Sequence, residues 1–134
     1  MTRLASLQEL FAPLFPGLMG LQLVAATPER VVATMVVRSD LCTTGKTLHG
    51  GALMAFADTL GAVGTFINLA EGKRTTTIDS STKFTGAAPQ GLTITGECTA
   101  LHRGRTTMVW QTVIKSDAGK ICGIVTQTQM VLDA

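Results

Sequence analysis

A histidine, two glycines and an aspartate stand at fixed spacing near the middle of the chain. His49-Gly50-Gly51 precedes an apolar run that holds Asp58 among Leu, Met, Phe and Ala side chains. A carboxylate buried without a partner is strongly disfavoured, so Asp58 must be paired, protonated or catalytic. The glycines open this run, where the first helical N–H groups lack partners and favour negative charge. The pattern predicts an oxyanion site and carboxylate-assisted attack on a carbonyl, by water or through an acyl-carboxylate intermediate.

Each of these residues also has a structural interpretation. Asp58 could be a buried carboxylate that only accepts a hydrogen bond from a Thr or a backbone amide. His49 could donate to a substrate carbonyl or orient its loop, or it could be a helix-entry histidine bonded to a neighbouring carbonyl. A nucleophilic triad is disfavoured because the sequence has no serine elbow and no evident Cys–His pairing.

The spacing along the helix limits how these groups can meet. Asp58 follows Gly51 by seven residues, which is two turns and roughly 10 Å on one helix. One substrate could not contact both groups of the same helix. It could do so if two copies of the helix ran antiparallel across a two-fold axis, so the spacing predicts a homodimer with two shared sites.

Hydroxyl side chains cluster after the apolar run, in Thr75-Thr76-Thr77 and Ser80-Ser81-Thr82. One of them could hold an attacking water or support Asp58. Threonine is also simply common in strands, which is the alternative explanation for most of these positions.

Basic residues occur in two places that could contact phosphate. Arg103 and Arg105 flank a glycine, and Lys73-Arg74 follows the apolar run. Each could bind phosphate or be an ordinary solvated charge. The sequence has no metal-ligand cluster, P-loop or dinucleotide fingerprint, so we expect no metal and no cofactor.

Length and composition favour a single domain spanning residues 1–134. Hydrophobic residues make up 46% of the 134 residues, and the formal net charge of +2 is too small for an electrostatic nucleic-acid footprint. Three cysteines without CxxC spacing disfavour a disulfide framework and a zinc site. The sequence has no export-signal or membrane-span pattern, so we expect a cytoplasmic protein with no nucleic-acid or membrane partner.

Hydrophobic periodicity predicts the order β-β-α-β-β-β-β after a short amphipathic N-terminal helix. That first helix is expected over 6–15, closed by Pro16-Gly17, and the one long helix over 50–69. The expected strands are 21–26, 31–38, 74–84, 92–101, 106–115 and 120–132. The long helix is apolar on most of its circumference and must lie against the sheet. The fold class is therefore α+β, a curved antiparallel sheet wrapped around one central helix.

The string His49-Gly50-Gly51 followed by Ala57-Asp58 resembles the hotdog-fold thioesterases, specifically the phenylacetic-acid-pathway (PaaI-like) branch of the acyl-CoA thioesterase superfamily. The resemblance extends over 18–132 and includes the hairpin at 101–111. It implies a hotdog fold, hydrolysis of a small or medium acyl-CoA or aroyl-CoA thioester, and assembly as a homodimer or a dimer of dimers.

The resemblance also implies catalytic roles for individual residues. Asp58 matches the family's general base or nucleophile, and Gly50 matches the glycine whose amide forms the oxyanion hole. His49 matches the histidine that orients or polarises the thioester. Thr77 matches a hydroxyl residue that helps position water.

Four further residues are expected to contact the substrate. Arg103 and Arg105 match basic residues that often meet the phosphates of coenzyme A, and Gly51 is the second glycine of the pair. Thr43 stands six residues before His49, where many relatives carry Asn or Gln.

Two rival functions remain open from the sequence. A non-catalytic protein that binds acyl thioesters, or is regulated by them, could keep the same pocket, although the presence of Asp58 disfavours it. A hydratase of the same fold would need its acid and histidine placed differently.

Overall fold

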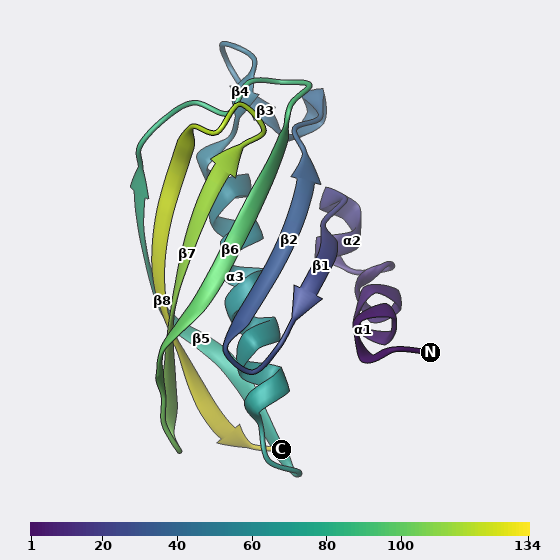
Figure 1. Cartoon of the computed structure of the whole chain (residues 1–134), viewed down its shortest axis with the longest axis vertical. Helices are drawn as coiled ribbons and strands as arrows, with labels where there is room; N and C mark the ends of the chain where they lie inside the picture. Colours follow the sequence, from purple (N-terminus) through teal and green to yellow (C-terminus); the bar gives the residue numbers. More distant parts are fainter.

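The structure, a computed structural model, describes residues 1–134 and has one curved antiparallel sheet around a long helix (Figure 1). The helices are α1 (Arg3–Phe11), α2 (Phe15–Met19), the 3-10 helix η1 (Ser39–Leu41) and α3 (Gly50–Asn68). The strands are β1 (Gln22–Ala26), β2 (Arg30–Val36), β3 (Cys42–Thr43), β4 (Thr47–Leu48), β5 (Lys73–Phe84), β6 (Thr93–Arg103), β7 (Thr107–Ser116) and β8 (Ile121–Asp133). The predicted fold class is confirmed, and so is the order of the six long strands and the long helix; α2, η1 and the short strands β3 and β4 are additional.

The six-stranded sheet has the order β1-β2-β6-β7-β8-β5, with antiparallel neighbours throughout. Strands β6, β7 and β8 form an antiparallel meander. Strand β5 follows α3 directly in sequence but lies at the far edge of the sheet, where it pairs only with β8, from Lys73 opposite Asp133 to Phe84 opposite Gly123. The chain therefore runs up α3 and back along the edge strand beside it.

Helix α3 packs on the sheet through large apolar side chains and through glycines that allow close approach. Phe56 and Leu60 are fully buried, as is Trp110 on β7. A Cβ added at Gly64 would lie 2.7 Å from the Trp110 ring, a contact too close for any larger residue. By length and hydropathy alone α3 could cross a membrane, but half of that stretch is buried inside the fold. It is the core helix of this domain.

The N-terminal helix differs from its predicted bounds. The chain forms two short helices, because Pro13 prevents α1 from continuing beyond Phe11. Pro16, expected to close a single helix, lies in the first turn of α2, where its missing N–H is not needed. The Gln8 side chain ties α1 to the sheet by bonding the backbone of Leu21 (2.9 Å) and Leu23 (2.7 Å).

The segment before α3, where the sequence predicts neither helix nor strand, contains η1 and a small β3–β4 hairpin. Its tip has two residues with positive φ, Gly45 at 83° and Lys46 at 58°, as tight hairpin turns require. The backbone N–H of His49 donates to the carbonyl of Leu41 at 2.9 Å. This contact fixes the direction in which the chain enters α3.

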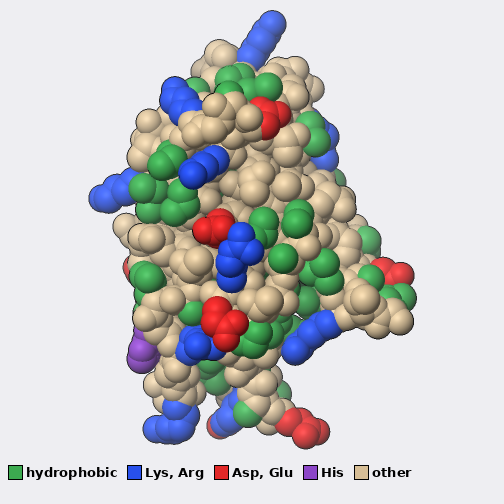
Figure 2. Space-filling view, viewed as in Figure 1, with side chains coloured by type: hydrophobic (Ala, Val, Ile, Leu, Met, Phe, Trp, Pro, Cys, Tyr) green, Lys and Arg blue, Asp and Glu red, His purple; other side chains and the backbone are tan.

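The surface carries mixed charge. Figure 2 shows basic, acidic and hydrophobic side chains interspersed over one face, and Arg30 and Glu97 form an ion pair at 2.6 Å. All three cysteines are free, and Cys98 and Cys122 are buried. Burial raises the pKa of the Cys98 thiol to about 11.

Candidate active site

The first turn of α3 leaves one backbone amide unpaired. His49 is the N-cap, and its Nδ1 accepts a hydrogen bond from the Gly51 N–H at 2.8 Å. The His49 carbonyl accepts from the N–H groups of Ala52 (2.9 Å) and Leu53 (3.2 Å). Of the four amides that a helix start leaves without intrahelical partners, only that of Gly50 has no acceptor in the chain.

At both glycines a neighbouring side chain occupies the space that a Cβ would need. A Cβ at Gly51 would lie 2.9 Å from the His49 Nδ1 and would push the capping ring away. A Cβ at Gly50 would lie 2.9 Å from the Phe84 ring, which packs over this end of the helix. Gly51 therefore leaves room for the capping ring, and Gly50 leaves room for the Phe84 ring.

The cap also fixes where the His49 proton lies. Because Nδ1 accepts from an amide, the neutral imidazole carries its proton on Nε2. The Nε2–H has no acceptor in the chain and remains available as a second donor at the start of the helix. This corrects one of the alternatives above: the ring caps an N–H and is not bonded to a neighbouring carbonyl.

An apolar cavity of about 260 Å³ adjoins this turn. Its lining combines the helix start with α2 and the segment before β3, and consists of Phe15, Leu18, Met19, Asp40, Leu41, Cys42, His49, Gly51 and Ala52. The one carboxylate there, Asp40, forms an ion pair with Arg38 at 3.0 Å. The hydrogen bond from that guanidinium holds the pKa of Asp40 below its ordinary value, so Asp40 is a poor candidate for a base.

Asp58 lies in the third turn of α3 and contacts the edge strand. Its Oδ1 accepts a hydrogen bond of 2.6 Å from the Thr77 hydroxyl on β5. No cation forms an ion pair with this carboxylate. The expectation of a fully buried carboxylate was wrong: Asp58 is half-buried, because α3 lies here along β5, beyond which the sheet has no further strand.

One chain does not bring the two halves of the predicted site together. Asp58 and the Gly50 amide lie on the same continuous helix, eight residues and therefore about 12 Å apart along its axis. On the Asp58 face, one turn away on either side, lie the half-buried side chains of Met54, Ala55 and Ala62 and the buried Gly61.

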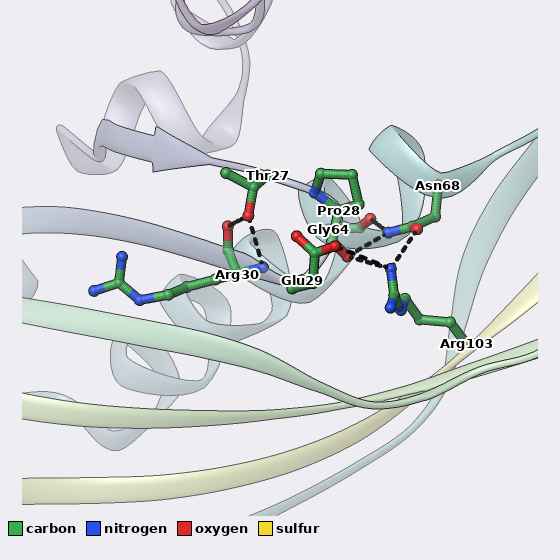
Figure 3. Close-up of polar contacts among 7 residues, drawn as sticks. All are labelled: Thr27, Pro28, Glu29, Arg30, Gly64, Asn68 and Arg103. Carbon is green, nitrogen blue, oxygen red and sulfur yellow. Dashed lines mark hydrogen bonds and ion pairs between the residues drawn. The ribbon is translucent and has the colours of Figure 1, made fainter.

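The basic residues that the sequence suggests as phosphate contacts lie near the end of α3 opposite His49. Arg103 belongs to β6, and its side chain reaches the β1–β2 turn and the helix end (Figure 3). It contacts the Glu29 carboxylate at 3.7 Å, and the Pro28 carbonyl and Asn68 Oδ1 at 3.5 Å each. Arg103 thus ties the turn to α3.

Arg105 has neither a hydrogen bond nor an ion pair in the chain, and with Lys73 it lines a cavity of about 160 Å³. Thr43 lies exposed opposite Thr47 near the hairpin tip and does not line the cavity beside His49. The structure therefore brings Thr77 to Asp58 and His49 to the glycine pair, and leaves Thr43 and the arginines apart from both.

Two functional candidates were missed from the sequence, Gln127 and Gln129. Both lie fully buried on β8, and the Gln129 side chain donates to the Thr77 hydroxyl at 2.6 Å. The signal was present in the strand alternation, because residues 125, 127 and 129 share one face and Val125 is a core residue. A side-chain amide buried on that face requires a hydrogen-bond partner.

Comparison with known proteins gives the family. A family model described as "Thioesterase superfamily" matches residues 45–122, which include the helix start, Asp58 and Thr77. The chain belongs to the thioesterase superfamily. This confirms the resemblance based on the His-Gly-Gly and Asp spacing.

Relatives and solved structures agree with this assignment. A candidate esterase of Deinococcus radiodurans is 33% identical over 105 residues, 76% of this chain and 64% of that protein. Proofreading thioesterase EntH of Cronobacter sakazakii is 35% identical over 75 residues, 56% of this chain and 54% of EntH. The chain thus spans less than two thirds of these two relatives.

The hotdog fold is shared along nearly the whole chain. Thioesterase HI1161 of Haemophilus influenzae superimposes with a TM-score of 0.92 at 26% identity, covering 99% of this chain and 92% of that one. The PaaI protein of Escherichia coli superimposes with a TM-score of 0.86 at 20% identity, covering 97% and 91%.

Proposed function

We propose that this protein hydrolyses a small or medium acyl-CoA or aroyl-CoA thioester to the free acid and coenzyme A. The observation that carries the proposal is the free Gly50 amide at the start of α3, together with the Asp58 carboxylate on the same helix. Thioester hydrolysis needs a donor for the oxygen that becomes negative and a carboxylate to drive the attack.

Each group has a defined part in this reaction. The Gly50 N–H and the His49 Nε2–H donate to the thioester oxygen as it gains negative charge. Asp58 either removes a proton from water or attacks the carbonyl carbon itself. Thr77 engages only Oδ1 of that carboxylate, so Oδ2 is the oxygen that meets the water or the carbonyl.

The complete site requires two chains. The separation of about 12 Å along α3 supports pairing the Asp58 of one subunit with the Gly50 amide of its partner across a two-fold axis. Strand β5 supports the same assembly, since it is a 12-residue edge strand with one side unpaired and such edges are usually covered. Two of these dimers would form the expected dimer of dimers.

The cavities support the choice of substrate. The apolar cavity beside His49 suits a small or medium acyl group. Arg105 lines a cavity together with Asn68, the last residue of α3, which lies ten residues and about 15 Å along the axis from Asp58. It is the free cation best placed to meet a coenzyme A phosphate, because Arg103 is engaged by Glu29.

One measurement separates this proposal from its rival, a protein that binds acyl thioesters without hydrolysing them. We would follow thiol release from coenzyme A thioesters with short, medium, branched and aromatic acyl groups, using the wild-type chain and Asp58→Asn. Asparagine keeps the size and can still accept from Thr77, but it loses the charge. We expect turnover to fall by about two to four orders of magnitude, with binding and folding retained.

Near-normal turnover by Asp58→Asn would remove Asp58 from the reaction. Binding of the thioesters without any thiol release would favour the non-catalytic alternative.

A further inference from the structure

A chain of hydrogen bonds, buried at its glutamine end and partly buried at its Asp58 end, connects α3 with β5 and β8. The Nε2 of Gln127 donates to the carbonyl of Ala57 at 2.7 Å. The Nε2 of Gln129 donates to Oε1 of Gln127 at 2.7 Å and to the Thr77 hydroxyl at 2.6 Å. Thr77 then donates to Asp58 at 2.6 Å. The series begins at the backbone carbonyl of Ala57 and ends at the side chain of Asp58, the next residue of α3.

The direction of every bond in this series follows from its first member. A backbone carbonyl only accepts, so Gln127 must turn its NH₂ group toward Ala57 and its oxygen toward Gln129. Gln129 must therefore present its own NH₂ group to both partners. Its oxygen faces the Thr75 hydroxyl at 3.0 Å, and the single proton of that hydroxyl is shared with the Met130 carbonyl at 2.9 Å. A threonine hydroxyl has one proton. Because Thr77 accepts from Gln129, its proton is directed to the carboxylate.

Packing holds the amides in this arrangement. Both glutamines are fully buried, and a Cβ at Gly61 would overlap the Gln127 amide. Gln127 therefore lies directly against the helix backbone at the level of Asp58. Buried polar networks whose members are all bonded are rigid and specify one geometry.

We infer that Gln129, held by Gln127, is a positioning residue for the hydrolysis proposed above. It fixes the Thr77 hydroxyl as a donor to Oδ1 of Asp58, which leaves Oδ2 directed at the reacting atoms. The inference rests on the proposed function, because it assigns Gln129 an effect on turnover. The support for the carboxylate is a neutral amide pair from the opposite strand, with no cation involved.

The test is a double-mutant cycle on kcat. Gln129→Met keeps the length of the side chain and removes the amide donor, and it would be made in the wild-type chain and in Thr77→Val. In the wild type we expect kcat to fall about 10- to 100-fold, the range for a misplaced catalytic group, while KM stays within about twofold. In Thr77→Val the same substitution should have little further effect, because the hydroxyl that it positions is gone.

Equal losses of kcat in both backgrounds, or a loss expressed in KM, would overturn the positioning role. Thr65→Val is the matched control, because it removes another buried hydrogen bond of α3, the one accepted from Trp110 at 2.9 Å. It should lower the melting temperature and leave kcat unchanged. A wild-type chain that releases no thiol from any thioester would instead contradict the proposed function itself.

Discussion

His49 has two separable tasks, which a pair of substitutions should resolve. Its Nδ1 caps α3 by accepting from the Gly51 amide at 2.8 Å, and its Nε2–H is free to donate to the substrate. Alanine removes both groups. Asparagine removes the second and keeps the first, because its side-chain oxygen is among the best N-caps.

The expected magnitudes follow from these contacts. Loss of a helix N-cap costs about 1 kcal/mol, which for a chain of 134 residues corresponds to a drop in Tm of about 3 to 4 °C. His49→Ala should show this drop and His49→Asn should recover most of it. Removing one donor from an oxyanion site lowers kcat about 100-fold or more, so both variants should be slow.

Thermal unfolding monitored by circular dichroism and thiol release from one acyl-CoA would be measured on the same preparations. If His49→Asn recovered turnover together with Tm, His49 would be a cap and not a donor to the substrate. An unchanged Tm in His49→Ala would refute the energetic role of the cap.

Two further predictions concern other parts of the chain. Between pH 9 and 11 the thiol of Cys98 ionises in the unfolded chain before it does in the folded chain, because burial raises its pKa to about 11. The free energy of unfolding, measured by urea denaturation, should therefore fall over this range by about 2 kcal/mol more than in Cys98→Ala. Arg105→Ala should raise KM for coenzyme A thioesters about 3- to 10-fold but not for acyl-pantetheine, whereas Arg103→Ala should leave KM unchanged. Equal effects of the two arginine variants would refute the distinction between them.

Elements with strong periodicity could be predicted closely. The long helix was expected over 50–69 and runs from Gly50 to Asn68. A long apolar run that follows a glycine pair fits few structures other than a helix. The N-terminal helix was placed wrongly because Pro13 was not weighed against the apolar spacing around it. The β3–β4 hairpin was missed because two-residue strands carry no alternation, and the hairpin depends on positive φ at Gly45 and Lys46.

The candidate site could be predicted only in part. The residue types and their spacing in the sequence predicted His49, Gly50 and Asp58 as site residues. Which backbone amide is free depends on the hydrogen bond from the Gly51 N–H to the His49 Nδ1, and the spacing does not reveal that bond. The engagement of Arg103 with Glu29 is likewise a contact between segments far apart in the chain. Such contacts require the tertiary arrangement.

The shared site is the central claim, and a mixed dimer tests it most directly. Asp58→Asn and His49→Asn subunits, carrying different tags, would be co-expressed and the mixed dimer purified. If each site joins the Asp58 of one subunit to the His49-Gly50 turn of the other, the mixed dimer has one intact site and one doubly impaired site. Its thiol release per dimer should be about half that of the wild type. Activity as low as that of the two parent variants would show that each site lies within one chain, and would contradict the account.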